Sequence, residues 1–97
     1  MPIFLVETYL TLGSAQRRTD RDRAAQAAAE AMTGDGTPVR FAGSIHIPAD
    51  ELCLFAFDTE ASGIAELAAE RAGFDALRVV HAVAPAFDPT KDGRPQP

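Results

Sequence analysis

The sequence predicts an α+β sandwich in which two helices cover one face of a four-stranded antiparallel sheet. Four short segments are rich in β-branched and aromatic residues, and two longer segments are rich in alanine and carry apolar residues at helical spacing. These segments follow one another in the order β-α-β-β-α-β. The strand segments are apolar on both faces, whereas a sheet with one face in water alternates apolar and polar residues. The face without helices therefore needs another partner.

The first part of the chain supplies one strand and one helix. Residues 3–9 are expected to form the first strand, in which Glu7 is the only charged residue. A helix is expected between Ser14 and Thr33, where small alanine side chains let a helix lie close to a sheet. Gly34 is placed to end this helix, because glycine readily adopts the left-handed conformation that follows a helix C-terminus.

A hairpin is expected next. Residues 39–47 alternate well enough to form a strand, and another strand is expected over residues 51–57. Pro48 sets the backbone angle of a tight turn between the two strands, and the side chain of Asp50 can hydrogen-bond locally within it.

The remaining elements are a second helix and a last strand. The helix is expected to start at Thr59 and to end at Gly73, and the strand is expected over residues 78–84. This order is the split β-α-β pattern of ferredoxin-like domains, in which both helices pack on one face of the sheet. We therefore expect a ferredoxin-like domain over residues 1–87 and a disordered tail, proline-rich and without an apolar pattern, over residues 88–97.

Hydrophobicity suggests which side chains face the helices. The uniformly apolar set is assigned to the helix side: Val39, Phe41, Ile45, Leu52, Leu54 and Ala56. The two hairpin strands then direct a second set to the uncovered face: Ala42, Ser44, His46, Cys53, Phe55 and Phe57. The outer segments add Leu5, Glu7, Tyr9, Val79, His81 and Val83. Such a patch exceeds what a monomer usually exposes, so we expect a homodimer that pairs through its sheets as a dimeric αβ-barrel-like assembly.

Composition narrows the function classes. The chain has 14 Asp and Glu against 9 Lys and Arg, and its basic residues form no aromatic-interleaved stripe, so nucleic-acid binding is not expected. There is no long apolar run and no charged-then-apolar leader, which predicts a soluble, cytoplasmic protein without a membrane partner. The single cysteine, Cys53, excludes both an internal disulfide and a cysteine-cluster zinc site.

Two kinds of chemistry fit the polar residues embedded in the strands. The first is binding of nickel or another divalent transition metal through nitrogen, sulfur and oxygen ligands, for which the candidates are Glu7, His46, Cys53 and His81. No two of them have the spacing of a local ligand pair, so the fold or a dimer axis must bring them together. The plainer interpretation is that the histidines are solvated or hydrogen-bonded and that Cys53 is a small buried hydrophobe.

The second kind is catalysis without a cofactor, of the isomerase, cyclase or monooxygenase type, on an apolar organic substrate. A histidine would be the general base, Glu7 would orient it, and a hydroxyl group would donate a hydrogen bond. The residues for these roles are His46, His81, Tyr9 and Ser44, with Phe55 and Phe57 as pocket walls on the open face of the sheet. A purely structural dimer is a third alternative.

The order of several residues resembles a known family. These residues are Met1, Pro2, Phe4, Val6, Glu7, Ser44, Pro48, Asp50, Glu51 and Cys53. The pattern is similar to a small ferredoxin-like family of unknown function that includes nickel-responsive and nickel-binding proteins, and the likeness covers about residues 2–85. It implies a dimer formed through the sheets and divalent-metal binding. Glu7, Asp50, Glu51 and Cys53 match positions of the family pattern, whereas the two histidines are proposed from chemistry alone.

Overall fold

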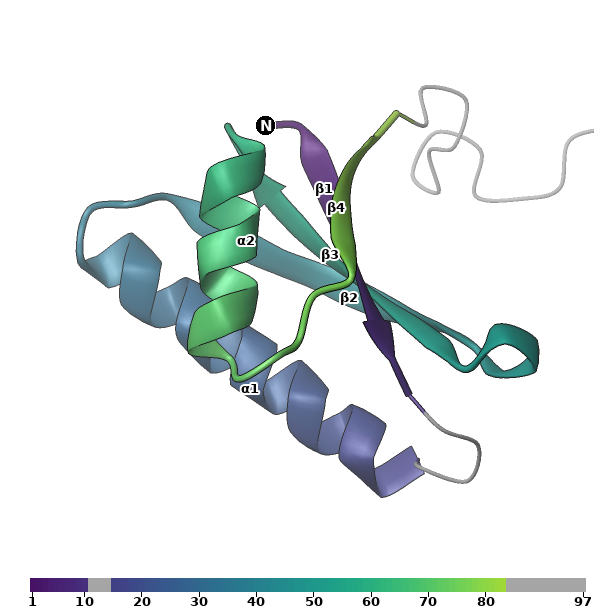
Figure 1. Ribbon diagram of the computed structural model, residues 1–97. Coiled ribbons are helices and arrows are strands. Elements are labelled where there is room, and N and C mark those ends of the chain that lie inside the picture. The colour runs from purple at the N-terminus through teal and green to yellow at the C-terminus, as the bar shows by residue number, and fades with distance from the viewer. Residues whose placement is uncertain (11–14, 84–97) are drawn as a thin grey trace, which may run out of the picture.

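The computed structural model describes residues 1–10 and 15–83 of the 97-residue chain. Its elements follow the predicted order (Figure 1): β1 (Ile3–Tyr9), α1 (Ala15–Gly34), β2 (Val39–Ile47), the short 3-10 helix η1 (Pro48–Asp50), β3 (Leu52–Thr59), α2 (Ser62–Arg71) and β4 (Arg78–Ala82). The expected disordered tail, residues 88–97, lies outside the described residues.

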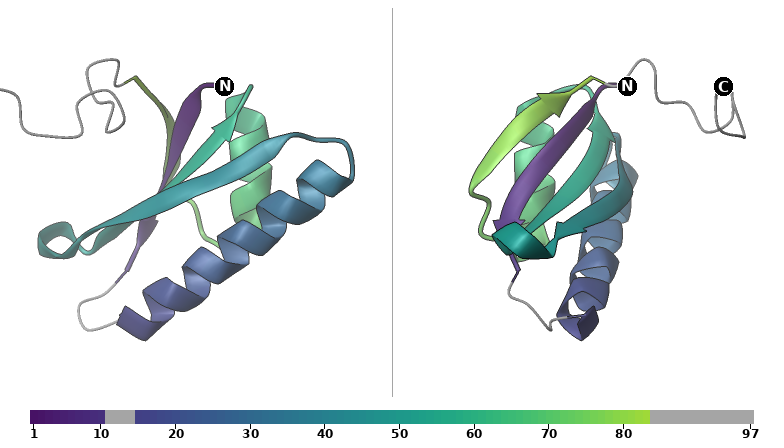
Figure 2. Two further views of the ribbon diagram at one scale, coloured as in Figure 1. Left: turned by 180° about the vertical axis from the view of Figure 1, so that it is seen from behind. Right: turned by 90° about the vertical axis from the view of Figure 1, so that its right-hand side faces the viewer.

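The four strands form one antiparallel sheet in the order β2-β3-β1-β4. Both helices lie on the same face of this sheet (Figure 2), with α1 packed chiefly against β2 and α2 against the other three strands. This arrangement confirms the predicted ferredoxin-like βαββαβ fold. In the described part of the chain, neither helix is long and apolar enough to cross a membrane.

A left-handed glycine follows the last residue of each helix. Gly73 ends α2 as predicted: it has a φ of 87°, its N–H bonds to Glu70, and the N–H of Phe74 bonds to Ala69. The last residue of α1 is Gly34, as predicted, but the left-handed glycine lies two residues later, at Gly36, with a φ of 97°.

The start of α2 also differs from the prediction. Thr59 belongs to β3, where its hydroxyl donates to the carbonyl oxygen of Pro38 at 2.9 Å. Because this hydroxyl is engaged across the sheet, it does not cap the helix, and α2 begins at Ser62.

A β-bulge in β2 reverses the alternation of its side chains. Phe41 is opposite Phe57 and Gly43 is opposite Ala56, so Ala42 is an extra residue without a partner. Side chains before and after the bulge are therefore out of phase. Val39 and Phe41 face the helices as predicted, but Ile45 and Ile47 turn to the opposite face, and Ser44 and His46 turn toward α1.

The core lies between the helices and the side chains that the sequence analysis had placed on the uncovered face. Cys53, Phe55 and Phe57 are each 0% exposed. The Phe55 ring lies 4.4 Å from that of Phe74, and the ring of Phe41 lies 5.6 Å from that of Phe57, measured between centroids. The predicted helix side of β3 was wrong, because both of its faces are apolar and the larger aromatic side chains are the ones covered.

The opposite face of the sheet, called the open face from here on, is covered by no described element. It is formed by Ile3, Leu5, Glu7 and Tyr9 of β1, Arg40, Ile45 and Ile47 of β2, Leu52, Leu54, Ala56 and Asp58 of β3, and Arg78, Val80 and Ala82 of β4. The predicted placement of the β1 side chains on this face is confirmed. Val79 and His81 lie instead on the helix side, where the His81 ring is 5.2 Å from the ring of Phe4.

Asp58 forms ionic contacts with two groups at one end of the open face. Its carboxylate accepts a hydrogen bond of 2.8 Å from Arg40 and lies 3.4 Å from the N-terminal ammonium of Met1. The Arg40 hydrogen bond, aided by the ammonium group, lowers the pKa of Asp58 below its ordinary value of 3.8. A lowered pKa stabilises the fold above the ordinary value, and this contribution is lost as the pH falls through the folded-state pKa.

We expect Asp58→Asn to lower the free energy of unfolding at neutral pH by less than about 1 kcal/mol, because Arg40 is exposed and screened by solvent. The difference from the unmodified protein should vanish at a pH below the folded-state pKa of Asp58. Urea unfolding at both pH values measures it, with Asp35→Asn, in the exposed loop after α1, as control. An equal deficit at both pH values would show that the ion pairs are not its source.

Candidate functional site

The four predicted metal ligands do not lie together within one chain. Glu7 is on the open face, where the Nε of Arg78 donates to its carboxylate at 2.5 Å. His46 and Cys53 are opposite each other on β2 and β3 and face α1. His81 shares that side of the sheet but lies on β4, three strand spacings or about 14 Å from β2. Only His46 and Cys53 are therefore neighbours.

The surroundings of Cys53 do not suit a metal ion. Burial raises the pKa of its thiol above the ordinary 9.0, and the charges of Arg18 and Arg21 offset this only in part. A metal ligand has to be the thiolate, and the two guanidinium groups also disfavour a nearby cation. Among the described residues, no group of three or more His, Cys, Asp or Glu side chains could hold a metal ion. Nickel binding stays a prediction that the geometry of these residues does not favour.

The raised pKa and full burial of Cys53 predict an unreactive thiol. We expect iodoacetamide to label the native protein at slightly alkaline pH only as fast as the chain unfolds, and to label it at once in denaturant. Mass spectrometry of the intact protein over time measures both rates. Rapid labelling of the native protein would contradict the position of Cys53 beneath α1.

A polar cluster occupies the space between the N-terminal part of α1 and the sheet. Arg18 donates from Nε to the hydroxyl of Ser44 at 3.3 Å and from Nη2 to its carbonyl oxygen at 3.1 Å. Arg21 donates from Nη1 to the carbonyl oxygen of Tyr9 at 2.7 Å and to the Thr8 hydroxyl at 3.4 Å. Thr8 in turn donates to the carbonyl oxygen of Cys53 at 3.0 Å. The two arginines connect α1 to β1 and β2, and the Thr8 hydroxyl connects β1 to β3.

Among the described residues of this region, two buried polar atoms have no hydrogen-bond partner. They are Nε2 of His46 and Oδ1 of Asp22. Asp22 lies close enough to Cys53 to act on its pKa, and His46 is opposite Cys53 in the sheet. A buried polar group without a partner costs about 1–3 kcal/mol, so such groups call for a specific explanation.

Sequence reasoning singled out His46, Ser44 and Cys53 but missed the helix residues that complete the cluster, namely Arg18, Arg21 and Asp22. The sequence does contain a pattern that could have identified these three residues. These residues continue, at helical spacing, the stripe of α1 side chains that is buried farther along the helix: Ala25, Ala28, Ala29 and Met32. Charged residues at positions in phase with a buried stripe face the protein, not the solvent.

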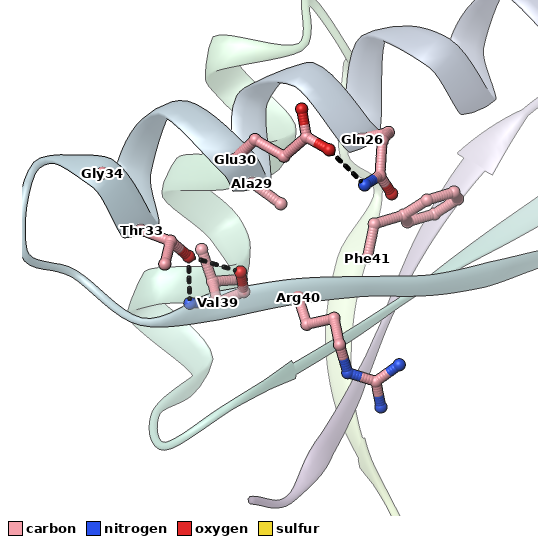
Figure 3. A pocket seen from close by; sticks show the side chains of 8 residues that line it. All are labelled: Gln26, Ala29, Glu30, Thr33, Gly34, Val39, Arg40 and Phe41. Atoms are coloured by element: carbon pink, nitrogen blue, oxygen red, sulfur yellow. Dashed lines mark hydrogen bonds between the residues drawn. The ribbon is translucent and has the colours of Figure 1, made fainter.

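A cavity of about 480 Å³ lies on the same side of the sheet, between the C-terminal half of α1 and β2 (Figure 3). Its lining consists of Gln26, Ala29, Glu30, Thr33, Gly34, Val39, Arg40 and Phe41. The Gln26 amide donates to Glu30 at 2.7 Å, and the Thr33 hydroxyl bonds both the N–H and the carbonyl oxygen of Val39. Because these polar groups already form hydrogen bonds within the protein, the part of the lining that is left for a ligand is apolar.

The position of this cavity corrects the predicted pocket. Phe55 and Phe57 cannot wall a pocket on the open face, because helix packing covers both rings completely. A smaller cavity of about 170 Å³ lies at the other end of α1, where it is lined by Thr8, Tyr9, Arg21, Gly73, Asp75 and Leu77. Ser44 lies beneath α1, and Tyr9 is on the open face with 64% of its surface exposed.

Comparison with known proteins supports the fold. No family model and no curated protein matches the chain. Among solved structures, the crystal structure of SCO4226 from Streptomyces coelicolor A3(2) superimposes with a TM-score of 0.71 at 15% sequence identity. The alignment covers 87% of this chain and 99% of that protein. At this level of identity, the likeness extends to the fold alone.

Proposed function

We propose that this protein is a small homodimeric binding protein whose two copies pair through their open faces. The observation that carries the proposal is the apolar character of the open face. Apolar side chains on it come from all four strands, and 54% of the surface of Ile45 is exposed. A typical monomer rarely leaves a contiguous apolar patch of this kind in water.

The charges on the open face are compatible with burial against an identical copy. Glu7 is paired with Arg78, and Asp58 is paired with Arg40, within the same chain. A charged side chain that is already paired within its own chain brings no unmatched ion into an interface. An unpaired charged side chain, in contrast, would oppose association. Strand spacing and rise give the four-stranded face dimensions of roughly 20 Å by 20 Å. An isologous contact would place this face against the same face of a second copy.

Native mass spectrometry tests the proposal. We expect the main species to have twice the 10.3 kDa mass of the chain, and sedimentation velocity should give the same result in solution. A monomer at high protein concentration in both measurements would overturn the proposed pairing. Adding one equivalent of nickel to the same sample tests the metal prediction separately, since bound nickel appears as added mass.

Catalysis on an apolar substrate is a second candidate function, favoured by the cavity between α1 and β2. Its volume of about 480 Å³ falls within the range of small-molecule sites. However, Glu30 is the only carboxylate in the lining, and it already accepts a hydrogen bond from Gln26. The lining offers apolar contact and no evident proton-transfer group, which favours binding over chemistry.

A further inference from the structure

We propose that the cavity between α1 and β2 binds a small, flat apolar molecule that carries a lactam group, and that this group pairs with the backbone N–H and carbonyl oxygen of Phe41. The inference rests on the proposed binding function and names the class of ligand. It does not depend on pairing of the open faces, because the cavity lies on the side of the sheet that the helices cover (Figure 3).

The backbone polar groups of Phe41 point away from the sheet. β2 is an edge strand, so β3 is its only neighbour in the described sheet. Backbone groups along an antiparallel strand point alternately toward one side and the other. Val39 directs both of its groups outward, because the Thr33 hydroxyl binds its N–H at 3.1 Å and its carbonyl oxygen at 2.8 Å. Phe41 follows Val39 by two residues, before the bulge, so its N–H and carbonyl oxygen point outward as well.

The pairing of β3 gives the same direction independently. Thr59, which is opposite Val39, donates its N–H to the carbonyl oxygen of Pro2, just before β1. Phe57 lies two residues before Thr59 and opposite Phe41, so its backbone groups also point toward β1. Phe57 therefore does not satisfy the N–H and carbonyl oxygen of Phe41.

Side chains of α1 already cap this edge of β2 on both sides of Phe41. Thr33 binds the backbone of Val39, and Arg18 donates to the carbonyl oxygen of Ser44. Within the part of the chain that the structure describes, no side chain, loop or second strand is hydrogen-bonded to the outward groups of Phe41. A peptide strand adding to this edge would have to displace both caps, whereas a small molecule would not.

The cavity beside Phe41 sets the size and apolar character of the ligand. Its volume is about 480 Å³, and its lining includes the buried side chains of Ala29 and Val39 as well as the Phe41 ring, on which an aromatic ligand can stack. A ring without polar groups would cover the N–H and carbonyl oxygen of Phe41 and leave them without partners, which is unfavourable. A lactam holds a donor and an acceptor on the same side of its ring and so satisfies both.

Amide hydrogen exchange of the ligand-free protein tests the direction of these backbone groups. We expect the N–H of Phe41 to exchange at least about tenfold faster than the N–H groups of Val39, which is bound to Thr33, and of Arg40, which faces β3. Equal protection of the three amides would show that the N–H of Phe41 already has a partner, and would overturn the proposal.

The ligand is tested by an NMR titration of the intact protein with oxindole, a flat bicyclic lactam. N-methyloxindole is the matched compound, because it keeps the carbonyl group but cannot donate a hydrogen bond. We expect oxindole to shift the amide resonances of Thr33, Gly34 and Phe41 but not that of His81, at the opposite edge of the sheet. It should bind about tenfold more tightly than N-methyloxindole. The absence of saturable shifts, or equal binding of both compounds, would overturn the proposal.

A capped peptide of alternating valine and threonine tests strand addition at the same edge. We expect it to leave the amide resonances of β2 unchanged, because the two caps from α1 stand in its way. Binding of this peptide in place of oxindole would identify the edge as a site for an extended peptide and would refute the lactam site.

Two variants of Phe41 isolate the role of its N–H. Phe41→Pro and Phe41→Leu both remove the ring, but only proline removes the N–H, and proline is tolerated where the N–H of an edge strand faces outward. Circular dichroism should show both variants folded, and oxindole should bind about tenfold more weakly to Phe41→Pro than to Phe41→Leu. Equal affinities, or a Phe41→Pro protein that unfolds while Phe41→Leu folds, would contradict the proposal.

Sedimentation of the same samples separates this site from the proposed pairing. A dimer that does not bind oxindole refutes only the ligand site. A monomer that binds oxindole refutes only the pairing of the open faces.

Discussion

Replacement of Phe55 by alanine is expected to destabilise the domain by about 3–5 kcal/mol, a large part of the stability of a protein of this size. The ring of Phe55 is fully buried, lies 4.4 Å from the ring of Phe74 and also approaches Phe41. Its removal leaves a cavity between the sheet and the helices that packed neighbours can only partly fill. Phe55→Glu should prevent folding, because it would bury an unpaired charge.

Urea unfolding followed by circular dichroism measures the effect of Phe55→Ala. Leu67→Ala is the control, because Leu67 lies on α2 with 41% of its surface exposed, and its truncation should cost far less. The sequence had placed Phe55 on the open face. A Phe55→Ala protein that keeps its stability but dissociates into monomers would favour that earlier assignment over the observed packing.

If two copies pair through their open faces as proposed, Leu54→Arg is expected to convert that dimer into folded monomers. Leu54 follows the buried Cys53 on the central strand β3, so its side chain points to the open face, opposite Glu7 on β1 and Ile45 on β2. An arginine there is well solvated in a monomer. Glu7 is already paired with Arg78. In a dimer, an arginine at position 54 would therefore leave one positive charge unmatched near the centre of the interface, which costs several kcal/mol.

Sedimentation velocity and circular dichroism together test this expectation. The matched control is Leu67→Arg, which adds the same charge to an exposed leucine on the helix side, far from the proposed interface. It should remain a dimer. If Leu54→Arg also remains a dimer with an unchanged dissociation constant, the copies do not pair through the open face.

The hairpin of β2 and β3 was predicted correctly in part from the sequence. The strands on either side of Pro48 were predicted correctly, and Ser44 and His46 were placed on the same face as Cys53, as observed. The prediction was wrong in placing that face on the side of the sheet that the helices do not cover. Because β3 is apolar on both sides, alternation alone could not tell which side the helices cover. The extra residue Ala42 reverses the alternation of side chains in β2, so the predicted faces of the residues after it were wrong. In the sequence, only the neighbouring Gly43 indicated a bulge.

The order of the elements was determined by the sequence alone, because strand propensity, helical spacing and turn residues are local properties that each segment carries with it. Tertiary structure decided which face was covered and which side chains met. The helices select the face that offers the larger aromatic groups, since burying them removes the most apolar surface from water. The same packing brings Arg18 on α1 into contact with Ser44 on β2, two residues that are far apart in the sequence and share no local pattern.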